Sequence, residues 1–374
     1  MKIAEVEVHI LESGYLGTKI IRDRAASPMG RFPRFAETRS SWIWPTAKVA
    51  TVVRADNGAQ GVSITNGGEV VAAIASRLGW LIRGETVDSP QDLWELMMRS
   101  ITLWDRSGFV GMGLAALDIA IWDLCADEAG KPLIDLLGGA RTDSMPVYIT
   151  TARPMAGSGF TGVKMPARYG PESGEEGMRQ NCMDVAAARE VLGTGADVSF
   201  DCFVGWDAGY TAQMIERLEP YRMRWIEDPL LPNDIEGFRK LAEAGHKFSV
   251  GNFLYSYAEI KQFLEMGVVE ALQPDVAWSG GITENLRIAE LARKFSVPLI
   301  FHNTTEQPWA LALSFALPCA EVEHVDRGGQ SILAELFAAQ APAPAGALSV
   351  ADIPASNRLS AAALSAMRRY NGDQ

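Results

Sequence analysis

Three polar residues recur at nearly equal spacing, each directly after a short apolar segment. They are Asp201, Glu227 and Asn252, so the intervals are 26 and 25 residues. Intervals of this size hold one strand and one helix, and the side chains are therefore expected to converge at the carboxyl ends of consecutive parallel strands. Oxygen ligands that converge in this way suit Mg²⁺. A single carboxylate could equally cap the next helix, but three residues in register favour a metal site.

A carboxylate and a histidine end the next two apolar segments. Asp275 follows Leu272-Gln-Pro, and His302 lies 27 residues later, after Leu299-Ile-Phe. An aspartate beside an imidazole orients the ring and raises its basicity, as a general base or acid near neutral pH requires. The alternative is a histidine that hydrogen-bonds loop carbonyls. Because this histidine lies where barrel enzymes place catalytic groups, we predict a catalytic Asp275–His302 dyad.

These residues need a scaffold of alternating strands and helices, and the chain supplies one after Gly139. Apolar positions fall on one face of the predicted helices Asp234–Gly245 and Thr283–Ser296. Strands are predicted at Pro146–Thr151, Gly159–Met165, Asp197–Phe203, Arg224–Asp228, Phe248–Phe253, Glu270–Val276, Pro298–Asn303 and Ala320–Val325. This alternation predicts an α/β fold of the TIM-barrel type. Because the eighth strand lacks an obvious long helix, we predict a modified (β/α)7β barrel over residues 141–330.

The first third of the chain has a different pattern. Lys2–Glu12 alternates at strand period, and Lys48–Arg54 runs into the turn Asp56–Gly58, which predicts a hairpin. Helices are predicted at Glu69–Ile82, Pro90–Ile101 and Met112–Glu128. We predict an α+β capping domain over residues 1–140, completed by the C-terminal tail 331–374.

Composition limits the possible classes of protein. At 374 residues, with 48% hydrophobic and 21% charged residues, the chain fits an ordinary two-domain globular protein. The net charge of −12 argues against a nucleic-acid partner, and an anionic substrate would need a local positive centre such as a metal. The four cysteines form no CxxC pair, and no signal peptide or membrane span is evident. We therefore expect a cytoplasmic protein without a membrane partner.

Taken together, the motifs resemble those of the mandelate racemase subgroup of the enolase superfamily. The resemblance is carried by Asp201, Glu227, Gln273–Gly281, His302 and the segment Ala115–Gly139. Within the subgroup, Ser27-Pro-Met, Thr151–Pro154, Lys164-Met-Pro and the Trp278-Ser-Gly-Gly turn look most like rhamnonate dehydratases. The resemblance implies a homo-oligomer that uses Mg²⁺ to dehydrate an acid sugar, either an aldonate or an aldarate. The proton α to the carboxylate is removed, an enediolate forms, and loss of the β-hydroxyl gives a 2-keto-3-deoxy acid.

Two positions depart from the family's pattern. Many relatives carry Lys-x-Lys on the second strand, but Pro166 replaces the second lysine here. The remaining Lys164 is expected to stabilise charge on the substrate carboxylate, unless it is only a structural ion-pair partner. Asn252 stands where most relatives of the rhamnonate type have glutamate, although glucarate-dehydratase-like members use asparagine there. The formal ligand charge falls from −3 to −2, which should weaken metal affinity and leave a stronger Lewis acid.

The resemblance also indicates which groups contact the rest of the substrate. The segment Ser13–Trp44 is basic in an acidic protein, and the corresponding region caps the barrel in the family. Candidates for binding substrate hydroxyls or a second carboxylate are Arg22 and Arg24. Arg168, just past Lys164, is a further candidate for the border of the substrate pocket. Glu321 matches the position where relatives place a carboxyl group beside the substrate carboxylate, and as a neutral acid it could donate a hydrogen bond to the enediolate. Glu323, two residues later on the same face, leaves the register open.

The leading hypothesis is a Mg²⁺-dependent hydro-lyase, and two alternatives stay open. One is a racemase, epimerase or cycloisomerase with the same first step. Pro166 counts against it, because racemisation usually needs acid/base groups on both faces of the substrate. The other is a metal-poor, catalytically silent family member that retains the barrel for binding or assembly. Asn252 favours this second alternative, whereas the Asp275–His302 pair argues against it.

Overall fold

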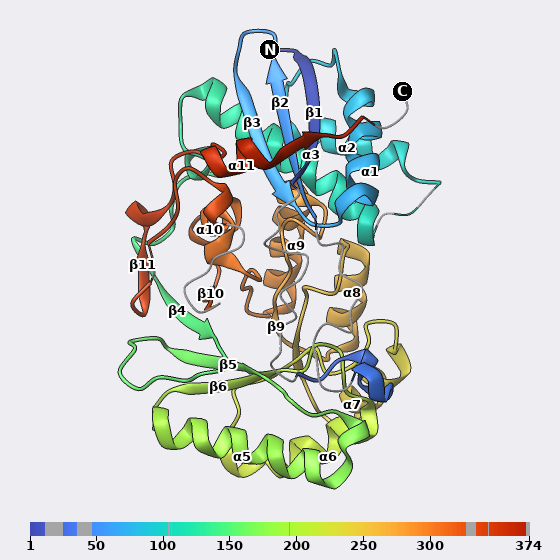
Figure 1. The fold of residues 1–374 in the computed structure, drawn as a ribbon, viewed down its shortest axis with the longest axis vertical. Coiled ribbons are helices and arrows are strands. Elements are labelled where there is room, and N and C mark those ends of the chain that lie inside the picture. The colour runs from blue at the N-terminus through green and yellow to red at the C-terminus, as the bar shows by residue number, and fades with distance from the viewer. Residues whose placement is uncertain are drawn as a thin grey trace.

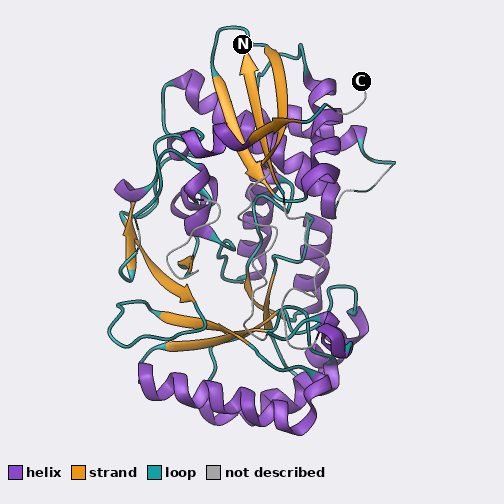
Figure 2. Cartoon of the chain, in the orientation of Figure 1, coloured by secondary structure: helices purple, strands orange, loops and turns teal. Residues whose placement is uncertain are grey.

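The computed structural model describes residues 1–11, 25–35, 47–103, 105, 107–193, 195–326, 334–342 and 344–371. An antiparallel sheet with its helices lies above a mainly parallel sheet that carries helices on its outer side (Figures 1 and 2). The predicted α/β fold with an antiparallel N-terminal domain is therefore confirmed. Arg22 and Arg24 lie outside the described residues.

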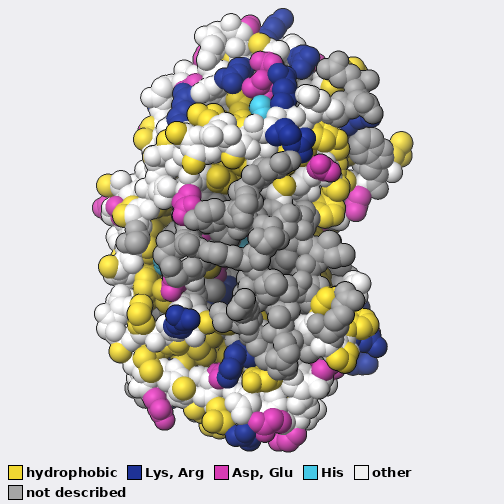
Figure 3. Space-filling view, viewed as in Figure 1, with side chains coloured by type: hydrophobic (Ala, Val, Ile, Leu, Met, Phe, Trp, Pro, Cys, Tyr) yellow, Lys and Arg dark blue, Asp and Glu magenta, His cyan; other side chains and the backbone are white. Residues whose placement is uncertain are grey.

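The antiparallel sheet has the strand order β12-β1-β2-β3. Its elements are β1 (Ile3–Leu11), β2 (Lys48–Ala55), β3 (Gln60–Thr65) and β12 (Met367–Arg369). Helices α1 (Gly68–Ile82), α2 (Pro90–Ser100) and α3 (Gly108–Ala129) pack against it, because alternate residues such as Val6, Val8 and Ile10 form a buried apolar face. The other face carries ion pairs, among them Arg369 with Glu5, and these charges gather over the upper domain in Figure 3.

Helix α3 is the centre of this domain. By length and composition it could cross a membrane, but 83% of its most apolar window is buried inside the protein. A helix that is apolar all round is expected in a core as well as in a membrane. Asp118 on α3 accepts hydrogen bonds from the backbone N–H and the hydroxyl of Thr283 in the other domain, at 2.9 and 2.6 Å. Helix α3 therefore holds the first turn of the helix Gly281–Phe295 in place.

The parallel sheet has the order β10-β4-β5-β6-β7-β8-β9, and β10 pairs with β4. The strands are β4 (Ser144–Thr150), β5 (Gly162–Pro166), β6 (Asp197–Asp201), β7 (Ile226–Glu227), β8 (Phe248–Val250), β9 (Val269–Leu272) and β10 (Val322–Val325). The helices are α4 (Leu133–Leu136), α5 (Gly174–Leu192), α6 (Ala208–Leu218), α7 (Ile235–Glu243), α8 (Tyr257–Met266), α9 (Gly281–Phe295) and α10 (Pro308–Ala316). The carboxyl ends of these parallel strands therefore lie together at one end of the barrel.

The predicted strand Pro298–Asn303 is reduced to two bridges. Leu299 pairs with Leu272 on one side and with Cys319 on the other, which joins β9 to the β10 segment. Pro274 and Pro298 lack the N–H group that a regular ladder needs, so the pairing is interrupted there. The backbone nevertheless stays in register, because His302 N–H donates to the Pro274 carbonyl at 3.0 Å. This bond fixes the backbone of His302 next to that of Asp275.

The C-terminal tail contributes to both sheets. Its β11 (Ala347–Ser349) pairs antiparallel with β4 of the barrel, whereas β12 pairs with β1 of the upper domain. Between them, α11 (Ala361–Ala366) follows the 3-10 helix η8 (Val350–Asp352). The tail therefore pairs with strands of both domains and does not belong to the capping domain alone.

A short piece of the N-terminal domain reaches the strand ends of the barrel. It contains the 3-10 helices η1 (Pro28–Arg31) and η2 (Pro33–Phe35), drawn in blue beside α7 in Figure 1. Ala26 N–H donates to the Ala167 carbonyl at 2.8 Å, just beyond β5. Gly205 permits this approach, because a Cβ atom there would lie 2.4 Å from the Ser27 nitrogen. The described part of the capping segment thus covers the ends of β5 and β6.

Candidate active site

The first two predicted metal ligands are neighbours at the carboxyl ends of β6 and β7. Asp201 and Glu227 are register partners in these parallel strands, and both side chains are buried. The Asp201 carboxylate accepts a hydrogen bond from Phe203 N–H at 2.9 Å. Phe203 and Asp228, which follow the two strands, have positive φ angles of 47° and 42°. Such angles are costly for residues other than glycine and often mark functional sites.

The third predicted ligand ends β8 and has an unused acceptor. Asn252 is 7% exposed, and its Oδ1 is buried without a hydrogen-bond partner among the described residues. Gly251 lets β8 approach β9 closely, because a Cβ there would come within 2.4 Å of the Gln273 carbonyl carbon. A buried, unpaired acceptor is costly and calls for a cation or donor. The donor set of two carboxylates and one amide oxygen fits a hard cation such as Mg²⁺.

Across the parts of the chain that are described, no three His, Cys, Asp or Glu side chains gather in a way that could hold a metal ion. The proposed set contains only two residues of these types, Asp201 and Glu227. The Asn252 amide oxygen, which has no hydrogen-bond partner among the described residues, is the third oxygen donor of the proposed set.

Lys164 on β5 lies in a buried ion-pair cluster. Its Nζ is 2.6 Å from Glu227 Oε1 and 2.8 Å from Glu323 Oε1, and all three side chains are 1% exposed. Burial opposes the charge on Lys164, but the two carboxylates outweigh it and raise its pKa well above the ordinary value. Lys164 is therefore a fixed positive charge and a poor proton acceptor near neutral pH. It directly contacts one of the predicted metal ligands.

The pKa values of the two carboxylates in this cluster shift in opposite directions. Burial raises the pKa of Glu227 to about 7, against the opposing effect of Lys164. Burial acts in the same direction on Glu323, but Lys164 and His302 outweigh it and lower the pKa of this side chain to about 2. One ammonium cannot fully neutralise two buried carboxylates. A further cation near Glu227 would therefore favour its ionised form.

Gln273 connects Glu227 to the interior of the barrel, a role that the sequence prediction missed. Its amide donates to Glu227 Oε2 and to Ser249 Oγ, and its carbonyl oxygen accepts from the Tyr148 hydroxyl at 2.6 Å. Gln273 precedes Asp275 by two residues, so strand alternation could have indicated that both point into the barrel. The network fixes the orientation of the Glu227 carboxylate.

The structure brings the predicted dyad together. His302 Nδ1 lies 2.9 Å from Asp275 Oδ2, which also accepts from the Gln307 amide at 3.0 Å. The other oxygen, Oδ1, accepts from Ala277 N–H at 2.9 Å. These donors hold the carboxylate in one orientation, and the carboxylate in turn holds the imidazole. Because Nδ1 is engaged, Nε2 is the ring nitrogen left for proton transfer.

The electrostatic environment of His302 favours its protonated form. Burial lowers the pKa of the imidazole, but the hydrogen bond that Nδ1–H donates to Asp275 and the charge of Glu323 raise this pKa above its ordinary value on balance. The indole of Trp278 covers the ring, with centroids 5.4 Å apart. His302 is therefore a basic, oriented and partly enclosed imidazole at the same end of the barrel as Lys164.

The structure corrects the prediction for Glu321. This side chain pairs with Arg224 and accepts from the Thr161 hydroxyl at 3.1 Å, and both partners precede strands of the barrel. Glu321 therefore lies at the opposite end from His302. Glu323 occupies the predicted place instead, since a shift of two residues keeps the side chain on the same face but moves it along the strand. Its lowered pKa also contradicts a neutral, hydrogen-bond-donating acid.

Arg168 forms an ion pair with a residue outside the candidate site. Its Nε donates to Asp184 Oδ2 at 2.7 Å, and the guanidinium also lies over the Tyr169 ring at 5.3 Å. Asp184 belongs to α5 on the outside of the barrel. The ion pair with Asp184 occupies the guanidinium N–H groups that would bind a substrate. The structure therefore argues against the predicted binding role of Arg168.

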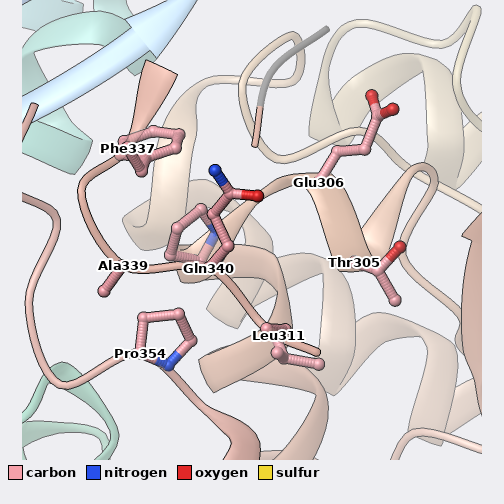
Figure 4. Close-up of a pocket in the computed structure, with 9 residues that line it drawn as sticks. Thr305, Glu306, Leu311, Phe337, Ala339, Gln340 and Pro354 are labelled. Atoms are coloured by element: carbon pink, nitrogen blue, oxygen red, sulfur yellow. The ribbon is translucent and has the colours of Figure 1, made fainter. Parts of the chain in front are cut away.

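The enclosed pocket drawn in Figure 4 is not the site of this chemistry. It lies between α10 and the C-terminal segment and is lined by residues such as Leu311, Phe337 and Pro354. Its volume of about 10 Å³ is only enough for about one water molecule. A sugar acid cannot enter it, so the strand ends remain the candidate site.

Known proteins share this combination of a capping domain and a barrel. Residues 44–138 match the family model for the mandelate racemase/muconate lactonizing enzyme N-terminal domain, and residues 148–354 match the enolase C-terminal domain-like family. The fold and the strand-end residues thus define an enolase-type barrel protein. The chain belongs to the mandelate racemase/muconate lactonizing enzyme family of the enolase superfamily, which confirms the predicted membership.

Individual relatives cover most of the chain. A protein of Caldivirga maquilingensis named "Putative L-rhamnonate dehydratase" is 32% identical over 75% of this chain and 72% of its own length. The crystal structure of L-rhamnonate dehydratase from Gibberella zeae superimposes with a TM-score of 0.89 at 25% identity, covering 98% of this chain and 96% of that one. A structure of rhamnonate dehydratase from the same organism, complexed with Mg, gives a TM-score of 0.91 at 24% identity with the same coverage.

Proposed function

We propose that this protein is a Mg²⁺-dependent acid-sugar dehydratase. The observation that carries the proposal is the convergence of two groups of residues at one barrel face. One is the oxygen set of Asp201, Glu227 and Asn252, and the other is the Asp275–His302 dyad with its 2.9 Å hydrogen bond. The similarity to proteins named as rhamnonate dehydratases, one of them complexed with Mg, supports the same activity and cofactor.

The roles of the residues follow from their geometry. Asp201, Glu227 and Asn252 would hold the ion, which would supply a Lewis acid for a substrate carboxylate. Lys164 adds a permanent positive charge beside that carboxylate. His302, through Nε2, removes the proton on the α-carbon and then protonates the departing β-hydroxyl, which leaves as water. The resulting enol takes up a proton at the β-carbon and becomes the 2-keto-3-deoxy sugar acid. Asp275 keeps the imidazole in the required tautomer and orientation.

The residues at the carboxyl end of β5 favour dehydration over racemisation. Pro166 cannot move a proton, and Lys164 is held as an ammonium between two carboxylates. Neither Pro166 nor Lys164 can therefore transfer a proton on the opposite face of the substrate. The direct test is a screen of mono- and diacid sugars with Mg²⁺ that detects 2-keto acid formation. Epimerised acid without any keto acid would overturn the proposal in favour of racemisation.

Lys164→Met is expected to lower both turnover and stability. Removing the ammonium leaves two buried carboxylates without their partner, and breaking a buried pair typically costs about 3–5 kcal/mol. Turnover per folded molecule should fall because the substrate carboxylate loses its positive neighbour. Thermal unfolding and steady-state assays measure the two effects separately. Lost stability with unchanged turnover per folded molecule would show that Lys164 is only a structural ion-pair partner.

The pKa of His302 is expected to fall when either neighbouring carboxylate is removed. Asp275 and Glu323 both stabilise the imidazolium, so Asp275→Asn and Glu323→Gln should shift its titration to lower pH. Glu321→Gln is the matched control, since Glu321 is a buried glutamate at the opposite end of the barrel. NMR titration of the imidazole measures all three variants. An equal shift in the Glu321 variant would refute the assignment of Glu323 to the site.

A further inference from the structure

Thr65, the last residue of β3 in the upper domain, contacts the segment that carries the aspartate of the dyad. Its hydroxyl donates to the Ala277 carbonyl at 2.9 Å, across a separation of 212 residues. Both residues are buried, so water does not compete for this hydrogen bond. The scheme of proton transfers described above gives Thr65 no role, although this bond links the capping domain directly to the loop that follows β9.

Ala277 is also the residue that holds the Asp275 carboxylate. Its N–H donates to Asp275 Oδ1 at 2.9 Å, while Asp275 Oδ2 lies 2.9 Å from His302 Nδ1. The Asp275 carbonyl accepts from Trp278 N–H at 3.0 Å, which closes a tight turn around Ala277. Ala277 is therefore held at its carbonyl by Thr65 and itself holds Asp275 through its N–H.

Trp278, the next residue, connects the same turn to the histidine ring. Its indole lies over the His302 ring, with centroids 5.4 Å apart, and packs against the apolar core of the upper domain. Trp94 on α2 fixes the far end of the turn, because its Nε1–H donates to the Gly280 carbonyl at 2.9 Å. The capping domain therefore holds this turn at both Ala277 and Gly280.

We propose that Thr65 is a positioning residue for the dyad. Its hydroxyl fixes Ala277, and Ala277 in turn holds the Asp275 carboxylate in the orientation that binds the His302 imidazole. The inference rests on the proposed function for its effect on turnover, whereas its effect on the imidazole can be measured without any reaction. Displacement of a reacting group by about 1 Å can lower a rate by about 100-fold, so loss of this hydrogen bond should be measurable.

Thr65→Val keeps the shape of the side chain and removes its hydrogen-bond donor. We expect kcat for 2-keto acid formation to fall by about 10–100-fold and KM to change less than about threefold, because the groups proposed to bind the substrate carboxylate are unchanged. Thr65→Ser keeps the hydroxyl and should retain most of the wild-type kcat.

Thr51→Val is the matched control for this substitution. Thr51 is a buried threonine of β2 whose hydroxyl has no hydrogen-bond partner in the described part of the chain, so kcat should stay at the wild-type value. An equal loss of kcat in Thr65→Val and Thr65→Ser, or in Thr65→Val and Thr51→Val, would overturn the inference.

NMR titration of the His302 imidazole separates this inference from the proposed function. Burial and the charge of Lys164 lower the pKa of the imidazole, whereas Asp275 and Glu323 raise it. Thr65→Val should loosen only the hydrogen bond with Asp275 and so shift the titration to lower pH. This shift in a protein that dehydrates no acid sugar would refute the proposed function and support the positioning role. A titration unchanged from wild type would overturn the inference, whatever the activity.

Trp94→Phe tests the same turn if Thr65→Val does not fold. It removes the N–H group that holds the Gly280 carbonyl and keeps an aromatic ring in the core of the upper domain. We expect a lower kcat and a His302 titration at lower pH, whereas Trp80→Phe, a substitution on the exposed side of α1, should change neither. Wild-type values of both quantities in Trp94→Phe would overturn the inference in that case.

Discussion

His302→Asn is expected to abolish dehydration almost completely. A positioned acid or base typically contributes about 10²–10⁴-fold, and His302 is proposed to perform both proton transfers. Asparagine has no group that titrates near neutral pH, and Lys164 cannot replace the imidazole because its pKa is raised well above the ordinary value. Asp275→Asn should lose less activity, since the imidazole remains present but is less well oriented. The measurement is steady-state formation of the 2-keto acid.

Solvent-deuterium exchange at the α-carbon separates the two roles of His302. If the His302→Asn variant still exchanges the α-proton but releases no water, His302 acts only as the acid, and another residue is the base. If neither exchange nor elimination remains, one imidazole performs both steps. A variant that dehydrates at the normal rate would show that the 2.9 Å contact between Asp275 and His302 has only a structural role.

Asp201→Ala is expected to remove both Mg²⁺ binding and activity. Direct ligands should matter more than groups behind them, so the affinity should fall by more than about 100-fold. The barrel should stay folded, because Asp201 lies at the end of β6 and its carboxylate accepts a hydrogen bond from the nearby Phe203 N–H. Calorimetry with Mg²⁺ and an assay of turnover measure the two effects.

The control for this experiment lies on the same strand. Asp197 begins β6 at the opposite end and pairs with Arg224 at 3.5 Å, with 53% of its side chain exposed. Asp197→Ala should therefore leave Mg²⁺ binding and turnover close to wild type, as for most exposed ion pairs. If Asp201→Ala kept full activity, or if both variants lost metal binding equally, the assignment of the strand-end ligands would be wrong.

The fold class and the strand ends that carry the candidate site are both predictable from the sequence. Both depend on local periodicity: apolar strands alternate with amphipathic helices, and Asp201, Glu227 and Asn252 follow consecutive strands at a constant interval. The same regularity predicts that Asp275 and His302 lie at neighbouring strand ends. These features depend on the nearly constant length of each strand-helix unit, so they can be predicted without knowledge of the tertiary contacts.

The contact partners of these side chains, in contrast, depend on tertiary packing and could not be predicted from the sequence. Period-two alternation places Glu321 and Glu323 on one face but cannot give their height along the barrel, so the choice depended on the pairing of β10 with β4. The bond from Arg168 to Asp184 and the contact of Lys164 with both Glu227 and Glu323 join residues from different elements. Such contacts are set by how strands and helices pack, which no local pattern in the sequence records.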